Sequence, residues 1–427
     1  MCDYVLRPGV LFIQGARNSA LYDTNNQRLI SLNNAATKQI LKGNYNPEFL
    51  NQLVAEDLLC KSNTQSNVGR GEESFKIEKK LRFVWFEITT SKCNLFCKHC
   101  YIGDTTPSKK RILSFKEWQS LIKQAHELGA IKCQFIGGEP FLYKDGNKSL
   151  LDLVQYAKEI GFESIEIFSN LQILPEEAVQ TLKDLNVKIA TSVYAIDASI
   201  HDAITGVNGS LDKTLRNLFL LKSKGVKLRV AVILMKINEE FVEETVHYFR
   251  NLGISCRNPD PIRPEGRGDN VELIPSNQYL MKYSLMMSPQ LMKIDMKTVC
   301  GSQQCHTCLD GKIVITESGD VFPCIFLREE SFGNVRFDKL QNVVQKENLQ
   351  EIWKMTKDDF LVCKDCEYRY ACFDCRALAN QVYKDTYKLG LAPNPWCTYN
   401  PYTGEWGKGF WRPVNGVLSY QPIVLKE

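Results

Sequence analysis

The chain of 427 residues lacks the long apolar runs of membrane proteins. No stretch approaches the roughly 20 apolar residues that cross a bilayer as a helix. The first residues, Met1 to Tyr4, also lack the basic and then apolar pattern of a secretory signal. We therefore expect no membrane partner and a cytoplasmic location.

A charge excess is missing as well. The 53 lysines and arginines nearly balance the 49 acidic residues, which leaves a net charge of +4. So small and evenly spread an excess argues against a nucleic acid partner. Histidine is scarce, with five in the chain. We assign none of these histidines a catalytic role, because they show no metal-ligand spacing with one another.

Cysteine, in contrast, is abundant. Twelve of the 16 cysteines fall in two zones, 93–100 and 300–397. In a reducing compartment such density indicates metal binding rather than disulfides. The length allows two or three domains with sizeable cores.

The first zone holds Cys93, Cys97 and Cys100 in a CxxxCxxC spacing, directly after the apolar segment 84–89. Iron-sulfur clusters are normally held by four cysteine thiolates. Three thiolates would therefore leave one iron open to a ligand. A three-cysteine zinc knuckle or a chance spacing is the alternative reading.

Strands and helices alternate regularly around this motif, within a domain that we place at 81–260. The predicted strands are 84–89, 132–136, 164–168, 187–193, 227–234 and 254–257. The predicted helices are 114–128, 149–160, 175–185, 211–224 and 239–252, the first opened by a capping box of Ser114 and Glu117. Six such strands with right-handed crossovers predict an α/β fold whose parallel sheet curls towards a barrel. Chemistry in such folds gathers at the carboxyl ends of the strands.

The cysteine motif in this setting resembles the radical SAM superfamily. The resemblance implies a partial, TIM-like (β/α)6 barrel, and S-adenosylmethionine bound by its amino and carboxylate groups to the open iron. It further implies cleavage to a 5′-deoxyadenosyl radical at the cluster of Cys93, Cys97 and Cys100.

Further cofactor contacts follow from the same resemblance. Glu139, in the run Gly137-Gly138-Glu139-Pro140, would hold the methionyl amino group, and Tyr101 would lie beside the adenine. Ser169, Asn170 and Ser192 would contact the ribose or the methionyl part. The alternative for the Gly137 to Pro140 run is a tight turn, and for the serines and Asn170 it is a role as polar turn residues. Packing alone would also explain Tyr101. Arg216 and Arg229 are candidates for the cofactor carboxylate, or solvated charges.

The second cysteine zone contains two CxxC pairs, which also suit a zinc ribbon. With its flanking cysteines the zone resembles the SPASM extension, at 300–427, which carries two auxiliary 4Fe-4S clusters. The resemblance implies one cluster on Cys363, Cys366, Cys372 and Cys397. The other would use Cys308, Cys324 and Cys375, with Cys300 or Cys305 as fourth ligand, so that the protein would hold three clusters.

Two departures from that pattern stand out. Only Phe373 and Asp374 separate the last paired cysteines, where the family commonly has three residues. Sulfatase-maturing relatives have an aspartate directly after the cysteine that matches Cys324, and Ile325 stands here. The second departure disfavours a sulfatase maturase.

The N-terminal segment 1–60 predicts a separable α+β domain. Strands over 10–13, 19–22 and 28–31 precede helices over 34–41 and 47–58. This order is similar to the winged-helix-like domain with which peptide-modifying radical SAM enzymes bind a leader peptide as an added strand, although any small α+β domain would give it. A polar linker follows at 61–80, and a breaker-rich bridge lies at 261–299.

Several segments resemble the grasp-with-spasm group of maturases, in which an ATP-grasp ligase is encoded nearby. These are Arg17-Asn18-Ser19-Ala20-Leu21-Tyr22-Asp23, Cys366 to Tyr370, Cys372 to Arg376, and Tyr399 to Trp406.

The sequence thus leads to the hypothesis of a radical SAM enzyme that modifies a ribosomally made precursor peptide with a leader. It would form a thioether or carbon–carbon crosslink in that peptide. A reductant such as flavodoxin or ferredoxin would supply the electron. A folded protein or a small metabolite is the alternative substrate. A metal-stapled peptide-binding scaffold without turnover is the non-enzymatic alternative.

Overall fold

The computed structural model describes residues 4–61, 78, 80–103, 111–283, 290–383 and 391–423. The predicted linker therefore lies almost wholly outside the described residues. The chain divides into two compact units. The larger comprises Lys79–Tyr283 and Gly311–Ile352, and the smaller comprises Met1–Glu78, Ser284–Asp310 and Trp353–Glu427.

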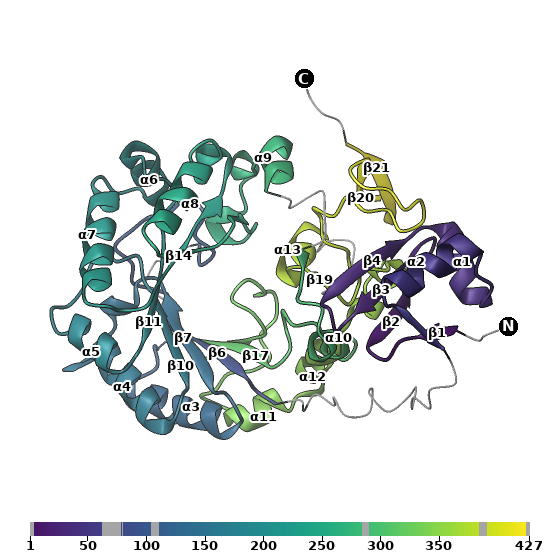
Figure 1. The fold of residues 1–427 in the computed structure, drawn as a ribbon. Helices are drawn as coiled ribbons and strands as arrows, with labels where there is room; N and C mark the ends of the chain where they lie inside the picture. The colour runs from purple at the N-terminus through teal and green to yellow at the C-terminus, as the bar shows by residue number, and fades with distance from the viewer. Residues whose placement is uncertain are drawn as a thin grey trace. The chain divides into compact units, whose positions relative to one another are not determined.

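An eight-stranded sheet forms the centre of the larger unit (Figure 1). In spatial order its strands are β14 (Ser255–Cys256), β12 (Leu228–Ala231), β11 (Lys188–Ser192), β10 (Ser164–Phe168), β7 (Lys132–Gly137), β6 (Phe83–Thr89), β17 (Lys312–Thr316) and β18 (Val321–Phe322). Only the β17–β18 pair is antiparallel. The predicted parallel sheet is confirmed, and all six predicted strand segments contribute to it.

Helices cover the convex side of this sheet (Figure 1). They are α3 (Phe115–Glu127), α4 (Leu150–Ile160), α5 (Ala178–Asp184), α6 (Ala198–Thr205), α7 (Ser210–Ser223) and α8 (Val242–Asn251). The capping box of Ser114 and Glu117 is present at α3. Trp118 of α3 packs against Phe86 of β6 with ring centres 6.0 Å apart. Phe86 therefore faces the helices, and its neighbour Glu87 faces the opposite side of the sheet.

Three features of this unit differ from the expectations. The predicted strand 227–234 is divided into β12 and β13 (Ile233–Leu234), and β13 pairs with β15 (Asp260–Pro261). Helix α6 was not expected; the Asp197 side chain caps it by accepting from the Ser199 and Ile200 N–H groups. Strand β17, from the cysteine-rich part of the sequence, pairs in parallel with β6 and extends the main sheet.

The shorter elements of the larger unit are β8 (Lys144–Asp145), β9 (Lys148–Ser149), α9 (Asn277–Lys282) and α11 (Leu340–Val344), with α12 (Glu347–Lys354) at its boundary. Gly319 turns the β17–β18 hairpin with φ +89°.

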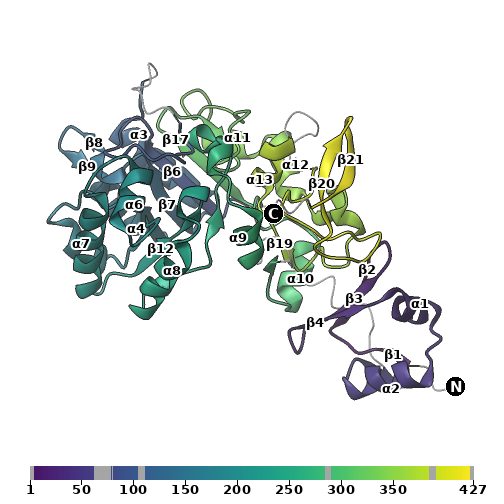
Figure 2. The same cartoon turned by 90° about the horizontal axis from the view of Figure 1, so that it is seen from above.

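The smaller unit begins with the elements predicted for segment 1–60. Strands β2 (Val10–Gln14), β3 (Ser19–Asp23) and β4 (Arg28–Leu32) form an antiparallel sheet, and β1 (Tyr4–Leu6) pairs with β5 (Leu59–Lys61). Helices α1 (Asn34–Lys42) and α2 (Pro47–Ala55) lie beside these strands (Figure 2). The later elements are β16 (Gln290–Leu291), α10 (Met296–Ser302), β19 (Cys372–Phe373), α13 (Arg376–Tyr383), β20 (Gly409–Val414) and β21 (Val417–Pro422).

Both faces of the β2-β3-β4 sheet are buried. One face packs with α1 and α2 through a cluster that contains Leu21 and Leu53. On the other face, Tyr22 shares a cluster with Val299 and Tyr370, and its hydroxyl donates to the Glu367 carbonyl at 2.8 Å. The expectation of a separable domain is therefore wrong in this respect, because the N-terminal segment shares a core with the C-terminal region.

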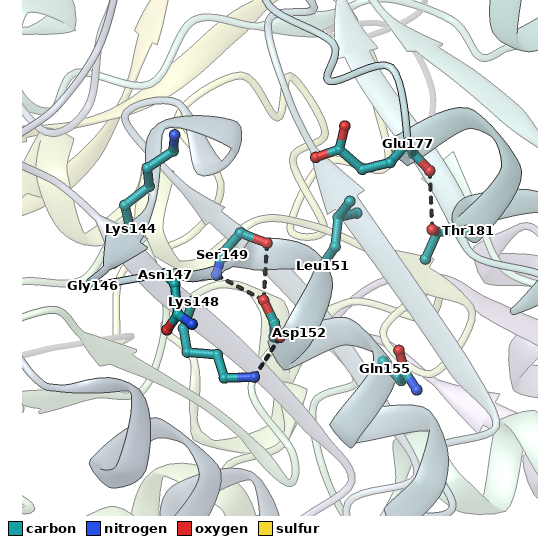
Figure 3. A pocket seen from close by; sticks show the side chains of 10 residues that line it. All are labelled: Lys144, Gly146, Asn147, Lys148, Ser149, Leu151, Asp152, Gln155, Glu177 and Thr181. Carbon is teal, nitrogen blue, oxygen red and sulfur yellow. Dashed lines mark hydrogen bonds and ion pairs between the residues drawn. The ribbon is translucent and has the colours of Figure 1, made fainter.

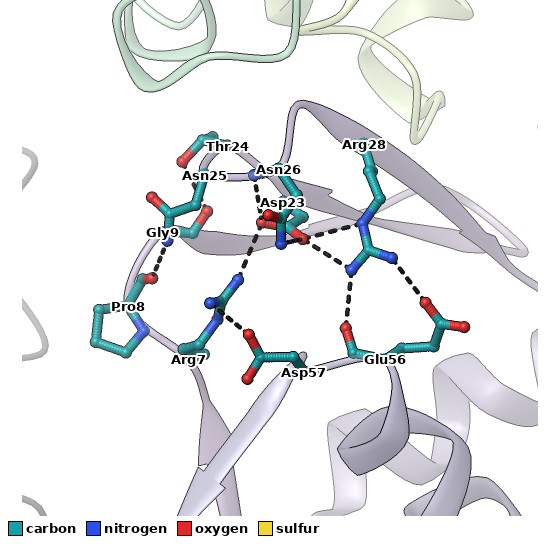
Figure 4. Close-up of polar contacts among 10 residues, drawn as sticks. All are labelled: Arg7, Pro8, Gly9, Asp23, Thr24, Asn25, Asn26, Arg28, Glu56 and Asp57. Atoms are coloured by element: carbon teal, nitrogen blue, oxygen red, sulfur yellow. Dashed lines mark hydrogen bonds and ion pairs between the residues drawn. The ribbon is translucent and has the colours of Figure 1, made fainter.

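A buried carboxylate fixes one end of this sheet (Figure 4). Asp23, which is fully buried, pairs with Arg7 at 3.3 Å and with Arg28 at 3.0 Å. The two arginines also reach Asp57 and Glu56 beyond the end of α2. The Asn26 amide and Arg28 hold the pKa of Asp23 below its usual value against the effect of burial. The network therefore ties the β3–β4 turn to the chain before β2 and after α2.

In the part of the chain that the structure describes, no helix has the length and apolar character needed to cross a bilayer.

Candidate active site and auxiliary cysteines

The loop that follows β6 brings Cys93, Cys97 and Cys100 together. Burial raises the pKa of Cys97 to about 12, and negative charge on Cys100 and Cys93 adds to the shift. Burial also raises the pKa of Cys93, with contributions from Glu139 and Cys100. The thiols are thus close enough to disfavour one another's ionisation, and a bound iron cluster would relieve this repulsion.

Two glycines join the end of β7 to this loop. The Gly138 N–H donates to the Thr89 carbonyl, and the Glu139 N–H donates to the Lys92 carbonyl at 2.9 Å. Gly137 has φ +143°, and a Cβ there would lie 2.6 Å from the Thr89 oxygen. The glycines therefore allow the neighbouring backbone, directly before Cys93, to approach closely.

Glu139 links the ends of two strands. Its side chain is fully buried and accepts hydrogen bonds from the Ser169 hydroxyl at 2.8 Å, the Asn170 N–H at 2.8 Å and the Phe141 N–H at 3.0 Å. Burial raises the pKa of Glu139 to about 7, although these three donors act in the opposite direction. A carboxylate accepts about four hydrogen bonds, so one acceptor position remains for a ligand.

Asn170 extends this network to the cysteine loop. Its amide nitrogen lies 2.7 Å from the Asn94 side-chain oxygen and 3.8 Å from the Cys93 sulfur. Its carbonyl accepts from the Thr214 hydroxyl of α7 at 2.8 Å. The predicted residues Glu139, Ser169, Asn170 and Cys93 therefore form one connected group.

Ser192, at the end of β11, reaches the same loop through Tyr194. The Tyr194 hydroxyl forms hydrogen bonds with the Ser192 and Cys97 side chains. Its ring lies 4.8 Å from the ring of His99, and burial lowers the pKa of His99 to about 4. Sequence reasoning missed Tyr194, although its place just after a strand end was a usable signal.

Tyr101 belongs to a second buried network, inside the curve of the sheet. Its hydroxyl donates to Glu87 Oε1 at 2.9 Å, and Arg328 forms an ion pair with the same carboxylate. The Arg328 guanidinium lies 5.2 Å from the Tyr101 ring centre. Glu87 and Arg328 were not predicted as site residues. The available signal for Glu87 was its place as an acidic residue in an otherwise apolar strand segment.

The predicted bridge also contacts the cysteine loop. Arg267 donates from Nε to the Cys97 carbonyl and from its backbone to the Cys100 carbonyl, each at 2.9 Å. A Cβ on Gly266 would lie 2.6 Å from the carbonyl oxygens of Cys100 and Tyr101. The run of glycines and prolines, which the sequence marked only as a breaker, therefore packs directly against the motif.

Of the two candidate arginines, Arg229 pairs with Glu166 of β10 at 2.7 Å and lies over the Phe168 ring. Arg216 lies on α7.

In the smaller unit, the structure brings together the thiols of Cys363, Cys366, Cys372 and Cys397. Burial raises the pKa of Cys397 to about 12, with charge on Cys363 and Cys372 contributing. Burial also raises the pKa of Cys366, with Glu367, Cys397 and Cys363 contributing. These four are the set that the resemblance implies for one auxiliary cluster.

The remaining predicted ligands are divided between the units. Cys305, Cys308 and Cys375 lie in the smaller unit with Cys300, and Cys324 lies in the larger unit after β18. The Cys300 thiol contacts the Met296 sulfur at 3.5 Å. The ligand set of this cluster stays a prediction.

In the described part of the chain, no three His, Cys, Asp or Glu side chains are arranged to hold one metal ion directly. A cubane binds its four thiolates through different iron atoms.

A polar pocket lies apart from all of these residues, beside hairpin β8–β9 and the start of α4 (Figure 3). Several of its polar groups pair with one another: Asp152 binds Lys148 at 2.8 Å and Ser149, and Thr181 donates to the Glu177 carbonyl. We assign it no role.

Comparison with known proteins is consistent with this geometry. Residues 88–249 match the radical SAM superfamily, and residues 305–367 match the SPASM iron-sulfur cluster-binding domain. The chain is 24% identical to the antilisterial bacteriocin subtilosin biosynthesis protein AlbA of Bacillus subtilis over 278 residues, 63% of this chain and 60% of AlbA.

Two other relatives are more fully covered. An AdoMet-dependent heme synthase of Oleidesulfovibrio alaskensis is 24% identical over 75% of this chain and 88% of its own. The PqqA peptide cyclase of Xanthomonas euvesicatoria is 26% identical over 62% of this chain and 72% of its own. The crystal structure of Streptococcus suis SuiB bound to precursor peptide SuiA has the same fold, with a TM-score of 0.55, 15% identity, and coverage of 92% of this chain and 98% of SuiB. The chain therefore carries a radical SAM domain over residues 88–249 and a SPASM iron-sulfur cluster-binding domain over residues 305–367.

Proposed function

We propose that this protein cleaves S-adenosylmethionine reductively and modifies a ribosomally synthesised precursor peptide, forming a thioether or carbon–carbon crosslink. The observation that carries the proposal is the convergence of the Cys93, Cys97 and Cys100 loop with Glu139, Asn170 and Tyr194 at one edge of the parallel sheet. When bound there, the cluster and S-adenosylmethionine would supply a 5′-deoxyadenosyl radical that abstracts a substrate hydrogen.

The protein's own residues would bind and orient the cofactor. Glu139 has one free acceptor position, which suits an ammonium group. Ser169 and Asn170 are already oriented by Glu139. Tyr101 is held by Glu87 beside the cysteine loop. We assign these residues to positioning, and no side chain to a catalytic base.

A peptide substrate is supported by the names of the relatives, since AlbA, PqqA peptide cyclase and SuiB are each associated with peptides. It is also supported by strand β4, which is an outer strand of the β2-β3-β4 sheet in the described residues. A leader peptide would add to this edge as a further strand. A flavodoxin or ferredoxin would supply the electron, and an ATP-grasp ligase encoded nearby would act on the same peptide.

The first test is chemical. Anaerobically reconstituted protein should produce 5′-deoxyadenosine with dithionite, and C93A should not. Coexpression with a small peptide encoded beside the gene should make that peptide two hydrogen atoms lighter for each crosslink, as read by mass spectrometry. If C93A cleaves S-adenosylmethionine as the parent does, the proposal is wrong. Three cubanes require about twelve irons per chain, whereas a zinc-stapled scaffold would contain no sulfide.

The second test concerns leader binding. Adjacent residues in a strand direct their N–H groups to opposite edges. Proline at Ile30 or at Ser31 of β4 therefore removes an outward N–H in one variant and a bond to β3 in the other. We expect one variant to keep its fold and lose binding of the labelled peptide in fluorescence anisotropy. If both variants bind the peptide normally, β4 does not receive the leader.

A small metabolite is the second candidate substrate, because the heme synthase relative is covered over 88% of its length. Unchanged peptide mass together with 5′-deoxyadenosine production would favour it.

A further inference from the structure

A group of buried charged side chains lies among the cysteines of the smaller unit. Lys357, Asp374 and Arg376, with His306, are each 5% exposed or less. We call these four residues the Asp374 cluster. Burying charges is costly unless they are paired and hydrogen-bonded. Three of them in one place therefore call for an explanation beyond packing.

Asp374 is the centre of this cluster. Its Oδ1 lies 2.9 Å from Lys357 Nζ and 2.7 Å from His306 Nε2, and its Oδ2 pairs with Arg376. The Arg376 guanidinium stacks 4.1 Å from the Phe360 ring centre and donates to the Ala392 carbonyl at 2.8 Å. The carboxylate is thus fixed by three donors on different segments.

The hydrogen bonds assign His306 its tautomer. The Cys308 N–H donates to Nδ1 at 3.3 Å, so Nδ1 carries no proton. Nε2 then carries the proton and donates to Asp374, and the ring is neutral. With two cations and one anion, the Asp374 cluster has one net positive charge.

This charge lies next to predicted cluster ligands. Lys357 Nζ is 4.0 Å from the Cys372 sulfur, at the outer limit of a hydrogen bond to sulfur. The charge of Lys357 also acts on Cys397, and that of Arg376 on Cys372. Asp374 itself stands in the chain between Cys372 and Cys375. Its carboxylate is buried.

We propose that the Asp374 cluster raises the reduction potential of the auxiliary cluster held by Cys363, Cys366, Cys372 and Cys397, and that Lys357 supplies its net positive charge. An iron-sulfur cluster becomes more negative on reduction, and a positive charge close by in a buried site stabilises that state. The inference rests on the proposed function and on the ligand set that the resemblance implies for this cluster. Lys357 and Asp374 act as positioning residues through the cysteines.

The sign of the charge gives two opposite expectations. Removing Lys357 leaves Asp374 paired with Arg376, so the net positive charge is lost and the potential should fall. Removing the Asp374 charge by D374N leaves two cations, so the potential should rise. If these residues only supported the fold, the two substitutions would shift the reduction potential in the same direction, or would not shift it at all.

The test is an EPR-monitored redox titration of the full chain. A C93A/C97A/C100A background keeps only the auxiliary clusters, so their signals are read alone. K357M, K357R and D374N are compared in this background. K354M is the matched control, since Lys354 lies three residues before Lys357 and is exposed. We expect a lower midpoint potential for K357M, a higher one for D374N, and parental values for K357R and K354M.

The outcomes separate this inference from the proposed ligand set. If the background variant holds no auxiliary iron, or if C372A and C397A keep all of it, the ligand set is wrong. If K357M and D374N keep the parental iron content and midpoint potential, the ligand set stands and the inference is overturned. Loss of the cluster in both variants would show a structural role and would also overturn it.

Discussion

Replacing Glu139 by glutamine tests a fully buried acidic group of the candidate site. Glutamine keeps one oxygen, which can accept from Ser169 and Phe141. Its NH2 group then faces the Asn170 N–H, which loses its acceptor. Leaving one buried donor unsatisfied costs about 1–3 kcal/mol, so E139Q should be less stable than the parent at pH 6.

The pH dependence follows from the direction of the pKa shift. Burial raises the folded pKa of Glu139 from 4.5 to about 7. The parent therefore binds a proton more tightly when folded, and this stabilisation is complete below pH 4.5 and lost as the pH rises to 7. At about 1.4 kcal/mol per pH unit, roughly 3 kcal/mol is lost in total, about 1.4 kcal/mol of it above pH 6. Glutamine does not titrate, so the free energy of unfolding of E139Q lacks this pH dependence. The difference in that free energy between the parent and E139Q should therefore shrink by about 1.4 kcal/mol between pH 6 and pH 8.

The assay is urea unfolding of both proteins at pH 6, 7 and 8 under anaerobic conditions, with the clusters bound. E127Q serves as the control, because Glu127 lies exposed on α3 and carries no buried charge. Equilibrium dialysis with S-adenosylmethionine at pH 8 adds a functional reading, in which E139Q should bind more weakly. A deficit that stays constant or grows from pH 6 to pH 8 would refute the reasoning.

Three further predictions concern the same unit. A Cβ at Gly138 would collide with the Lys92 carbonyl, so G138A should lose the iron of one cluster, whereas G146A, with no atom within 4 Å, should keep its iron in anaerobic iron analysis. E87Q and R328M should each destabilise the protein by about 3–5 kcal/mol, and the double variant should cost less than their sum; additive values in urea unfolding would contradict the pairing. R267M removes the Nε bond to the cysteine loop and should speed iron loss to a chelator, and an unchanged rate would show that the loop holds without it.

The central sheet was predictable because its signals are local. Apolar runs such as 164–168 alternate with helices that carry their own caps, and each βα unit dictates the next parallel strand. Strand β10 is found over the predicted residues, and α3 begins at the predicted capping box. The cysteine spacing was equally local, and the family that it indicated is confirmed.

Other features depend on residues far apart in the chain. Strand β17 joins β6 by pairing Val314 with Trp85, and periodicity cannot reveal so distant a partner of a strand. The Glu87–Arg328 pair, 241 positions apart, was missed for the same reason. The burial of Tyr22 against Val299 and Tyr370 likewise needs a tertiary contact. The winged-helix-like character of the N-terminal segment, the count of three clusters and the cytoplasmic location stay predictions.

The sequence by itself therefore determined the family, the parallel sheet and the candidate thiols of the site. Cysteine spacing and strand–helix alternation are both patterns within short segments. Only the tertiary structure decided how that site is enclosed. Glu139 receives its three donors, Tyr101 its carboxylate, and Asp374 its cations from segments distant in sequence. The energy of such buried polar contacts depends on which groups meet in space, and no local pattern records that.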